Sequence, residues 1–412
     1  SYSDNKNIQY FSQLADREQK LEENMMDTYI SEAVKYIGAD DTTLDLFESQ
    51  YKIPNGVSYN SYVILDEKVA VMDTIDERKT DEWFANLENA LNGRDVDYLV
   101  ISHLEPDHAA NIKRAAERYK NAKLVLSVKA KAMLPQFFDI ANLEERCITV
   151  KEGDILELGA HKLTFVMAPM VHWPEVMVEY EMTEKILFSA DGFGKFGALS
   201  ADEEWTDEAR RYFINIVGKY GASVQTLLKK AAALEIKTIC PLHGPVLKEN
   251  LEFYIGKYLT WSSYEPEEDG VLVASASIHG NTKAAAEKMT EILRANGASK
   301  VVFMDLTRDD MAEAVASAFR YGKIVLAAAS YDGGIFPPME DFLHRLEHKN
   351  FQKRTIGIIE NGSWAPCAAK GMKEILGKMK DISICENTVS IKSVMKDTDT
   401  AKMEELAKEL LA

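Results

Sequence analysis

Residues 98–108 read Tyr98-Leu99-Val100-Ile101-Ser102-His103-Leu104-Glu105-Pro106-Asp107-His108. The apolar run at their start predicts a buried strand, and four potential metal ligands follow at its carboxyl end. Side chains alternate along an extended segment, so His103, Glu105 and Asp107 are expected on one side. His108 would then point elsewhere, which favours a second metal ion. Imidazole mixed with carboxylates favours iron or another redox-active ion over a structural all-thiolate site.

Three further candidate ligands follow later predicted strands. They are His172 in residues 168–174, Asp191 in residues 189–194 and His243 in residues 240–245. Glycine and proline residues surround each of them, and such residues fix irregular backbone where a ligand must turn inward. Four histidines and three carboxylates are most simply a two-metal site. Asp191, which lies among glycines, is the best placed carboxylate to bridge the two ions.

Composition restricts the class of protein. The 412 residues suggest two or three domains, and 46% hydrophobic with 28% charged residues are typical of a globular chain. A net charge of -18 disfavours nucleic acid and anionic membranes as partners. No apolar run has the length of a membrane span, and the N-terminus lacks the order of a signal peptide. The four cysteines form no Cys-x-x-Cys pair, which excludes a rubredoxin-like module in this chain and favours the reducing cytoplasm.

The chain is predicted to contain an N-terminal extension (1–27), a first α/β domain (28–262), a linker (263–269) and a second domain (270–412). A short helix is expected within residues 8–21. In the first domain we expect a hairpin at 62–65 and 69–72, strands at 123–127, 161–166, 185–189 and 236–239, and a largely helical stretch at 204–234. In the second domain, strands at 271–274, 300–304, 323–328, 355–359 and 384–391 alternate with helices. This alternation predicts a doubly wound, five-stranded parallel sheet.

Three loops at strand ends of the second domain indicate a nucleotide site. Residues 275–282 form a turn rich in hydroxyl groups that opens a helix, where backbone N–H groups and the positive helix end favour a phosphate. Residues 330–337 and 361–366 lie at the carboxyl edge where doubly wound sheets bind ligands. Their aromatic residues, Tyr331 and Trp364, could flank a flavin ring. The alternatives are an ordinary capped strand-to-helix turn and simple loop packing.

These motifs together give the chain a family resemblance. The ordered set of seven ligands resembles the metallo-β-lactamase fold, whose first motif is usually His-x-His-x-Asp-His. Here Glu105 replaces the second histidine of that motif. With a flavodoxin-like domain following, the chain resembles the flavodiiron proteins, also called A-type flavoproteins, from about residue 26 to its end. The resemblance implies an N-terminal metallo-β-lactamase-like αββα sandwich, followed by a flavodoxin-like doubly wound five-stranded parallel sheet.

The resemblance also implies cofactors and ligand roles. It implies a non-haem di-iron site with His103, Glu105, His172 and bridging Asp191 on one iron. Asp107, His108, His243 and the same Asp191 would hold the other iron, and all seven residues would be catalytic. It further implies FMN in contact with the residues of the three loops, namely Ser277, Ile278, His279, Gly280, Asn281, Thr282, Ser330, Tyr331, Asp332, Gly333, Gly334, Ile335, Phe336, Asn361, Gly362, Ser363 and Trp364.

The function implied by the resemblance is reduction of O2 to water, of NO to N2O, or both, as a detoxifying oxidoreductase. The expected partners are a rubredoxin-like or other small electron donor and a second copy of the chain, in a head-to-tail homodimer or a homotetramer. Residues 50–57 carry no histidine where many family members carry His and Arg, so the preference between the two gases stays open. Two alternatives remain: a zinc hydrolase of the metallo-β-lactamase superfamily with an appended flavodoxin domain, and an electron-carrying flavoprotein whose metal domain only docks.

Overall fold

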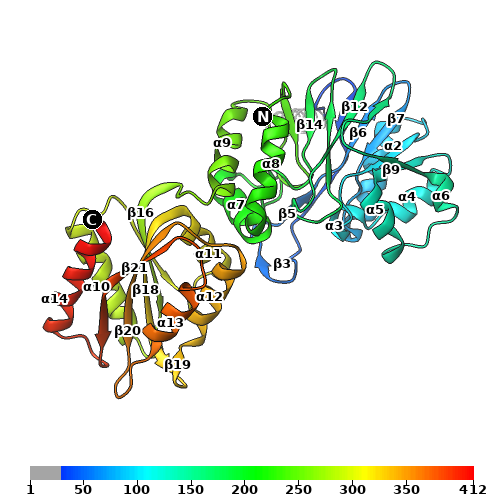
Figure 1. Cartoon of the computed structure of the whole chain (residues 1–412). Helices are drawn as coiled ribbons and strands as arrows, with labels where there is room; N and C mark the ends of the chain where they lie inside the picture. The colour runs from blue at the N-terminus through cyan, green and yellow to red at the C-terminus, as the bar shows by residue number, and fades with distance from the viewer. Residues whose placement is uncertain (1–28) are drawn as a thin grey trace, which may run out of the picture. The chain divides into compact units, whose positions relative to one another are not determined.

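The computed structural model describes residues 29–412, and the expected extension with its short helix lies outside this range. The described chain forms two compact units (Figure 1). The first unit comprises residues 29–45, 54–202 and 233–251, and the second comprises residues 46–53, 203–232 and 252–412. The domain limits given by the sequence stay a prediction. Within residues 29–412, no helix has the length and apolar character that crossing a membrane requires.

The first unit contains a six-stranded sheet of order β1-β6-β7-β8-β9-β10. Strands β6 and β7 pair antiparallel, which confirms the predicted hairpin, whereas β7 to β10 run parallel and bring their carboxyl ends to one edge. Trp83 and Leu87 of helix α2 (Thr80–Leu91) are fully buried. The strands are β1 (Val34–Tyr36), β6 (Tyr62–Leu65), β7 (Val69–Met72), β8 (Tyr98–Ile101), β9 (Lys123–Ser127) and β10 (Cys147–Val150).

A second sheet of order β11-β12-β13-β14-β15 packs against the first. The core between the sheets joins Tyr62 and Val100 of one sheet to Phe165 and Phe188 of the other. Strands β12, β14 and β15 point the same way, so the loops that follow them meet at one edge. The strands are β11 (Ile155–Glu157), β12 (Lys162–Met167), β13 (Met177–Glu181), β14 (Ile186–Phe188) and β15 (Thr238–Cys240). A two-stranded sheet of β2 (Ala39–Asp41) and β5 (Val57–Tyr59) completes the unit.

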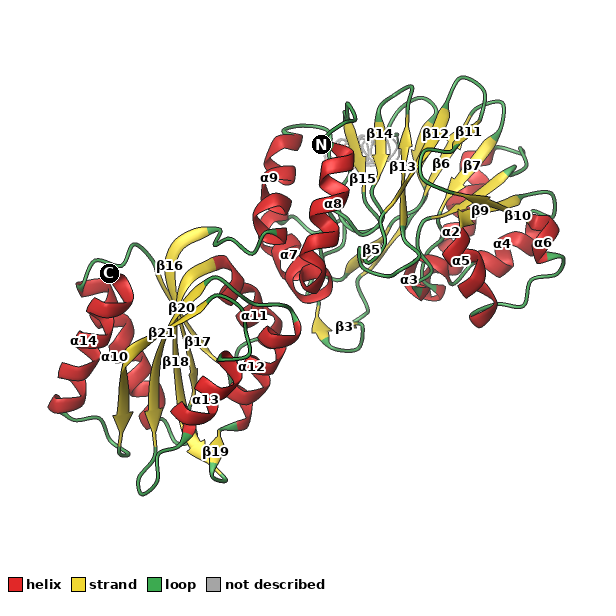
Figure 2. Ribbon diagram, in the orientation of Figure 1, coloured by secondary structure: helices red, strands yellow, loops and turns green. Residues whose placement is uncertain are grey.

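The second unit contains a parallel sheet of order β17-β16-β18-β20-β21, which confirms the predicted five-stranded doubly wound sheet. The short strand β19 (Gly334–Ile335) adds to β18 antiparallel. Helices α10 and α14 lie on one face of the sheet and α11, α12 and α13 on the other (Figure 2). The strands are β16 (Glu268–Ala276), β17 (Val301–Asp305), β18 (Tyr321–Tyr331), β20 (Arg354–Asn361) and β21 (Ile382–Ile391). The helices are α10 (Asn281–Ala295), α11 (Met311–Arg320), α12 (Pro337–His348), α13 (Ala368–Leu376) and α14 (Asp397–Leu411).

Residues 263–269, expected as a polar linker, are partly ordered by packing within the second unit. Strand β16 already begins at Glu268, and Glu267 is buried. Its carboxylate accepts hydrogen bonds from Arg210 of helix α7 (Trp205–Tyr212), at 2.6 and 2.8 Å, and from the indole of Trp261, at 2.8 Å. The helices α7, α8 (Gly221–Ala231) and α9 (Leu251–Ser262) therefore belong to the same compact unit as the parallel sheet. The small hairpin of β3 (Leu46–Phe47) and β4 (Tyr51–Lys52) joins them there.

Candidate metal centre and nucleotide cleft

The structure brings all seven candidate metal ligands together, and it divides the first motif into the two sets that the family resemblance implies, not as strand alternation predicts. Strand β8 ends at Ile101, and helix α3 (Pro106–Ala109) begins at Pro106. The expectation that His103, Glu105 and Asp107 share one side is wrong, because proline at a first helical position starts a helical turn before Asp107. The turn directs Asp107 into a second group with His108.

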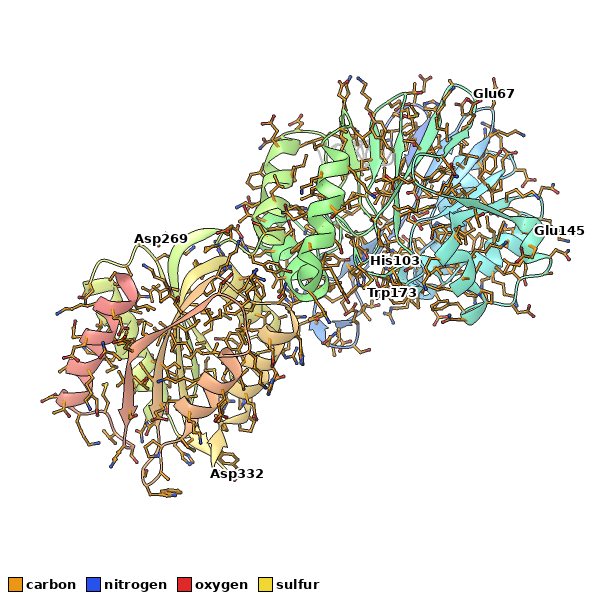
Figure 3. All side chains as sticks on the ribbon, viewed as in Figure 1. Glu67, His103, Glu145, Trp173, Asp269 and Asp332 are labelled. Carbon is orange, nitrogen blue, oxygen red and sulfur yellow. The ribbon has the colours of Figure 1, made fainter. Side chains whose placement is uncertain are left out.

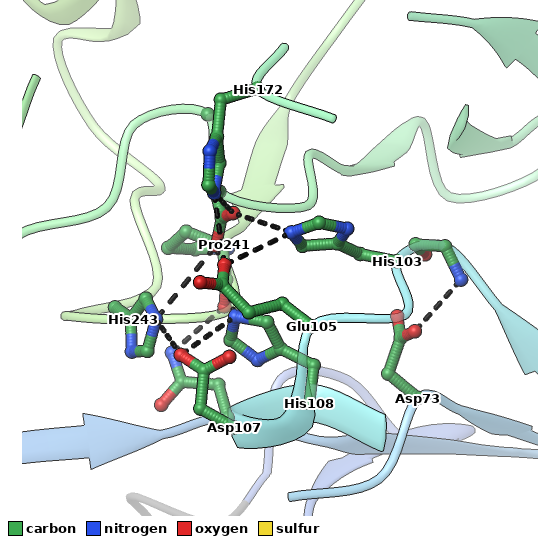
Figure 4. Close-up of polar contacts among 12 residues, drawn as sticks. Asp73, His103, Glu105, Asp107, His108, His172, Pro241 and His243 are labelled. Carbon is green, nitrogen blue, oxygen red and sulfur yellow. Dashed lines mark hydrogen bonds and ion pairs between the residues drawn. The ribbon is translucent and has the colours of Figure 1, made fainter. Parts of the chain in front are cut away.

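The first group consists of His103, Glu105, His172 and Asp191. Figure 4 labels the first three of these residues. The Oε2 atom of Glu105 lies 3.2 Å from His103 Nε2 and 2.9 Å from His172 Nε2. The same two nitrogens lie 3.4 and 3.3 Å from Asp191 Oδ2. Four ligand atoms from three separate loops thus converge on one point.

The second group consists of Asp107, His108 and His243. The Oδ2 atom of Asp107 lies 3.3 Å from His108 Nε2 and 3.1 Å from His243 Nε2. The other oxygen of Asp191, Oδ1, lies 3.0 Å from His108 Nε2 and 3.8 Å from His243 Nε2. The two oxygens of Asp191 therefore face different groups, which is the arrangement of a carboxylate that bridges two ions.

The donor atoms fit metal ions. Ligands at about 2.1 Å from an ion and at right angles to each other lie about 3 Å apart, close to most of the separations within each group. Both oxygens of Asp107 are buried and make no hydrogen bond to any described residue, and Oδ2 has only the ion-pair contacts with His108 and His243 given above. Buried carboxylate oxygens without such partners are costly unless a cation satisfies them. Imidazole and carboxylate ligands together suit iron and related ions.

In the polypeptide without metal ions, the carboxylates and histidines of the two groups shift each other's pKa values. Burial by itself would lower the pKa of His172, but Asp191 and Glu105 raise that pKa to about 10. Burial would also lower the pKa of His108, but Asp107 and Asp191 raise that pKa to about 9. The pKa of Asp191 falls well below its usual range, because the charges and hydrogen bonds of His108 and His172 outweigh its burial. A metal ion at neutral pH must therefore displace protons from these imidazoles.

Partners behind the ligands were not found in the sequence. Glu175 is 1% exposed, and its Oε1 atom lies 2.7 Å from Nδ1 of His103 and accepts a hydrogen bond from the Leu104 amide at 2.8 Å. His243 Nδ1 lies 2.7 Å from the carbonyl oxygen of Ser58. The ring of Trp173 meets His103 edge-on at 5.1 Å between ring centres. Figure 3 labels these two residues close to each other in the first unit. Of these residues, only Trp173 and Glu175 lie close to a candidate ligand, His172, in the sequence, and this closeness is the only sign of their role that the sequence offers.

Asp73 and Glu179 are two buried carboxyl groups near His103, and their hydrogen bonds described here come from Ser102 and not from a basic side chain. Asp73 accepts a hydrogen bond from the Ser102 amide at 2.8 Å, and the Ser102 hydroxyl donates to Glu179 at 2.9 Å. Burial raises the pKa of Asp73 to about 6, and burial together with the Asp73 charge raises the pKa of Glu179 well above its usual value. Both carboxyl groups therefore favour the protonated form more than an exposed carboxyl group does.

The second unit has a cleft of about 700 Å³ where the three predicted loops meet. Gly280, at the N-terminus of α10, has φ of 99°, a conformation that favours glycine, and its amide donates to the Ser277 hydroxyl at 3.0 Å. Tyr331 and Trp364 are 46% and 92% exposed. The predicted residues that line the cleft are Ser277, Ile278, His279, Asn281, Thr282, Ser330, Tyr331, Asp332, Gly333, Asn361, Gly362, Ser363 and Trp364.

Four predicted contact residues do not line this cleft, and four others do. Gly280 caps α10, Gly334 and Ile335 form strand β19, and Phe336 caps α12. The sequence reading missed Ala329, Ala365, Cys367 and Ser393. Ser393 lies beyond the fifth strand and reaches the cleft because its backbone N–H and C=O pair with the Asn361 side chain at 2.9 and 2.8 Å. Only the tertiary fold brings that loop to the site.

Comparisons with known proteins agree with this architecture. Residues 57–244 match the family model described as ODP family beta lactamase. The anaerobic nitric oxide reductase flavorubredoxin of Aliivibrio fischeri is 28% identical over 351 residues, which are 82% of this chain and 70% of that protein. An uncharacterised protein of Methanocaldococcus jannaschii is 26% identical over 388 residues, covering 92% of this chain and 97% of that protein.

Solved structures give the same result. The rubredoxin oxygen:oxidoreductase of Desulfovibrio gigas superimposes with a TM-score of 0.85 at 25% identity, over 93% of this chain and 97% of that chain. The flavodiiron protein of Giardia intestinalis superimposes with a TM-score of 0.84 over 93% and 97%, and at 24% identity this likeness concerns the fold. The predicted fold class, a metallo-β-lactamase-like part followed by a flavodoxin-like part, is confirmed.

Proposed function

We propose that this chain, which belongs to the flavodiiron protein family, reduces dioxygen to water, nitric oxide to nitrous oxide, or both. The chain is an oxidoreductase, as are the relatives named nitric oxide reductase and oxygen oxidoreductase. The single observation that supports this reaction best is the pair of ligand groups that meet at the two oxygens of Asp191. Such a pair can hold two metal ions close enough to act on one diatomic molecule or on two.

Family membership supplies the cofactors, which are FMN and a non-haem di-iron site. We assign one iron to His103, Glu105, His172 and Asp191, and the other to Asp107, His108, His243 and Asp191. When bound, the iron pair supplies a binding site for the gas, and the iron pair and FMN together supply the electrons.

The protein side chains set the charge of this centre. Three carboxylates, Glu105, Asp107 and Asp191, with side chains 16%, 11% and 1% exposed, would offset the positive charge of the metal ions. An anionic ligand stabilises the ferric state more than a neutral imidazole does, so Glu105 favours iron over zinc at the position where hydrolases usually carry histidine. Trp173 covers the His103 ring and is itself covered by the stacked ring of Phe137. These rings place apolar surface beside the His103 side of the centre.

We assign FMN to the cleft of the second unit. Backbone amides at the start of α10 and the hydroxyls of Ser277 and Thr282 would receive the phosphate. The exposed rings of Tyr331 and Trp364 offer flat apolar faces for the isoalloxazine ring. The carboxyl edge of the sheet, between β16 and β18, is where doubly wound folds bind such ligands.

Gly362→Ala is expected to lower FMN content. A Cβ at this position would lie 2.8 Å from the Pro366 Cα atom, so the loop that carries Trp364 must shift. The measurement is the flavin-to-protein ratio after gel filtration, together with flavin affinity for the reconstituted protein. The matched control is Gly256→Ala in helix α9, where a Cβ meets no atom within 4 Å. Equal flavin affinity in both variants would show that the 361–366 loop does not shape the site.

We further propose a head-to-tail homodimer, alone or as a dimer of dimers. The metal ligands and the flavin cleft lie in different compact units, so electron transfer between them requires that the two cofactors be brought close. A second copy of the chain can bring the flavin of one subunit to the metal pair of the other. The names of the relatives support a rubredoxin-type electron donor. We also propose a cytoplasmic location, which the four cysteines without a Cys-x-x-Cys pair support. A monomer with full turnover in ultracentrifugation and assay would contradict the dimer.

Metal and flavin analysis tests the proposed function against the zinc-hydrolase alternative. The comparisons do not favour a hydrolase, because the matching relatives carry the names of reductases. We expect about two irons and one FMN per chain when the protein is produced with both metals supplied. Two zinc ions per chain with no iron, together with hydrolysis of an ester or lactam substrate, would replace the reductase by the hydrolase. Retained reductase activity without either metal would leave only the flavin as the active group.

A further inference from the structure

The two groups contain the same kinds of candidate metal ligand. Each group offers two histidine nitrogens and one carboxylate of its own, and each faces one oxygen of the shared Asp191. The carboxylates are Glu105 in the first group and Asp107 in the second, with side chains 16% and 11% exposed. The inner ligands alone therefore give the two metal ions the same charge and nearly the same ligand chemistry.

The Nδ1 atoms of the ligating histidines, whose Nε2 atoms face the metal site, have different partners in the two groups. In the first group, His103 Nδ1 lies 2.7 Å from the carboxylate of Glu175, which is fully buried. In the second group, His243 Nδ1 lies 2.7 Å from a neutral acceptor, the carbonyl oxygen of Ser58. The Nδ1 atom of His108 makes no hydrogen bond to a described residue. Glu175 is thus an anion that reaches a ligand of one group only.

A carboxylate behind a ligating histidine has a known physical effect. It fixes the tautomer, so that Nδ1 carries the proton and Nε2 faces the metal, and it makes the imidazole a stronger electron donor. A stronger donor stabilises the more highly charged metal ion. Burial of Glu175 leaves its charge unscreened by salt.

We infer that Glu175 is a positioning residue that makes the two irons unequal. When the metal pair holds a single added electron, the ferric charge lies on the iron of His103, Glu105 and His172, and the electron lies on the iron of Asp107, His108 and His243. The inference rests on the proposed function, because it requires a pair of irons. It goes beyond that function, because it names which iron is reduced first and the residue that decides it.

The test compares Glu175→Gln with a matched control. The glutamine oxygen can still accept the hydrogen bonds that Oε1 of Glu175 accepts from His103 and Leu104, so the substitution removes the charge and keeps the geometry. The control is Glu184→Gln, which removes a carboxylate 2.8 Å from Nε2 of His161, a histidine outside both ligand groups. Iron and FMN are counted in each protein. Potentials of the iron pair are measured by redox titration with electron paramagnetic resonance, and the one-electron-reduced pair is examined by ⁵⁷Fe Mössbauer spectroscopy.

In the wild type and in Glu184→Gln we expect separate ferric and ferrous Mössbauer signals in the one-electron-reduced pair. In Glu175→Gln we expect the iron of the first group to become easier to reduce by about tenfold in its equilibrium constant, which is 59 mV for one electron. Equal potentials in the two variants would overturn the inference, as would a wild-type spectrum that averages the two irons.

The inference and the proposed function fail in distinguishable ways. A wild type with two irons and fast gas reduction, but with averaged irons, overturns the inference alone. A chain that binds no iron pair overturns both. A second readout does not depend on turnover: in the di-zinc protein, ¹⁵N nuclear magnetic resonance should show a protonated Nδ1 on His103 with a strongly hydrogen-bonded proton. An unprotonated Nδ1 there would contradict the role of Glu175 even where the glutamine variant fails to fold.

Discussion

Asp191→Asn is expected to abolish the reduction of both gases while leaving FMN in place. Asp191 is the one described residue whose two carboxylate oxygens face both ligand groups, at 3.0 to 3.8 Å from the four histidine nitrogens. An amide nitrogen cannot replace a carboxylate oxygen as a metal ligand, and the substitution removes a charge that both ions share. The expected loss is more than about 100-fold, since removal of mere outer partners of metal ligands already costs about 10- to 100-fold. The measurements are the rate of reoxidation of the reduced protein by O2 and by NO, and the iron content.

The control for this variant is Asp81→Asn, which changes an exposed aspartate on helix α2 of the same unit. It should reoxidise like the wild type. Loss of iron with retention of FMN in Asp191→Asn would place the defect at the metal centre. Wild-type rates with FMN alone would instead favour the electron-carrying flavoprotein, in which the metal part only docks.

Glu267→Gln is expected to destabilise the second unit by about 3–5 kcal/mol, the cost of breaking a buried ion pair by removing one partner. The side chains of Arg210 and Glu267 are each 3% exposed, and two hydrogen bonds join them. The glutamine variant leaves the buried guanidinium with only the exposed carboxylate of Asp207, 2.8 Å from Nη1, as an anionic partner. Urea unfolding followed by tryptophan fluorescence measures the effect, because Trp205 and Trp261 stack on each other in this unit.

Glu267 also determines whether the stability of the second unit rises or falls with pH. Burial alone would raise the pKa of Glu267, but hydrogen bonds and charge from Arg210, with further bonds from Lys257 and Trp261, lower that pKa to about 2. A carboxyl whose folded pKa lies below its unfolded value stabilises the fold fully above about pH 4.5 and loses this contribution as the pH falls toward 2. The wild type should therefore lose more stability across that range than Glu267→Gln does.

The control for the stability effect is Glu265→Gln in the same segment. Glu265 is 55% exposed and pairs with Lys353 at 2.5 Å, so its loss should cost less than about 1 kcal/mol. If the Glu265 and Glu267 variants unfold at the same urea concentration, the buried pair does not hold the start of β16 in the way described.

The candidate metal ligands could be proposed from the sequence because they lie in loops that follow apolar strands. Such strands are recognised by their composition alone, and His103, His172, Asp191 and His243 each follow one of them. The division between the two groups was not predictable by alternation, because Pro106 starts a helix within the motif. The three loops that line the cleft were located for the same reason, whereas Ser393 comes from a loop that only the packed fold brings to Asn361.

Where a role depends on a partner distant in the sequence, the sequence does not reveal that partner. Glu175 lies 72 residues from His103 in sequence, and its contact requires the two sheets to be packed. Glu267 lies in a stretch of acidic residues with proline and glycine, which has the composition of a linker, and its partner Arg210 is 57 residues away. In both cases a buried charge is paired with a residue far away in the sequence, and local composition does not reveal such a pairing.

The most direct measurement is anaerobic stopped-flow of the fully reduced protein against O2 and against NO, with iron, zinc and flavin quantified on the same sample. The proposed function predicts about two irons and one FMN per chain and rapid reoxidation by at least one gas, and the two rates then rank the gases. Zinc in place of iron, with reoxidation no faster than that of free reduced flavin, would contradict it.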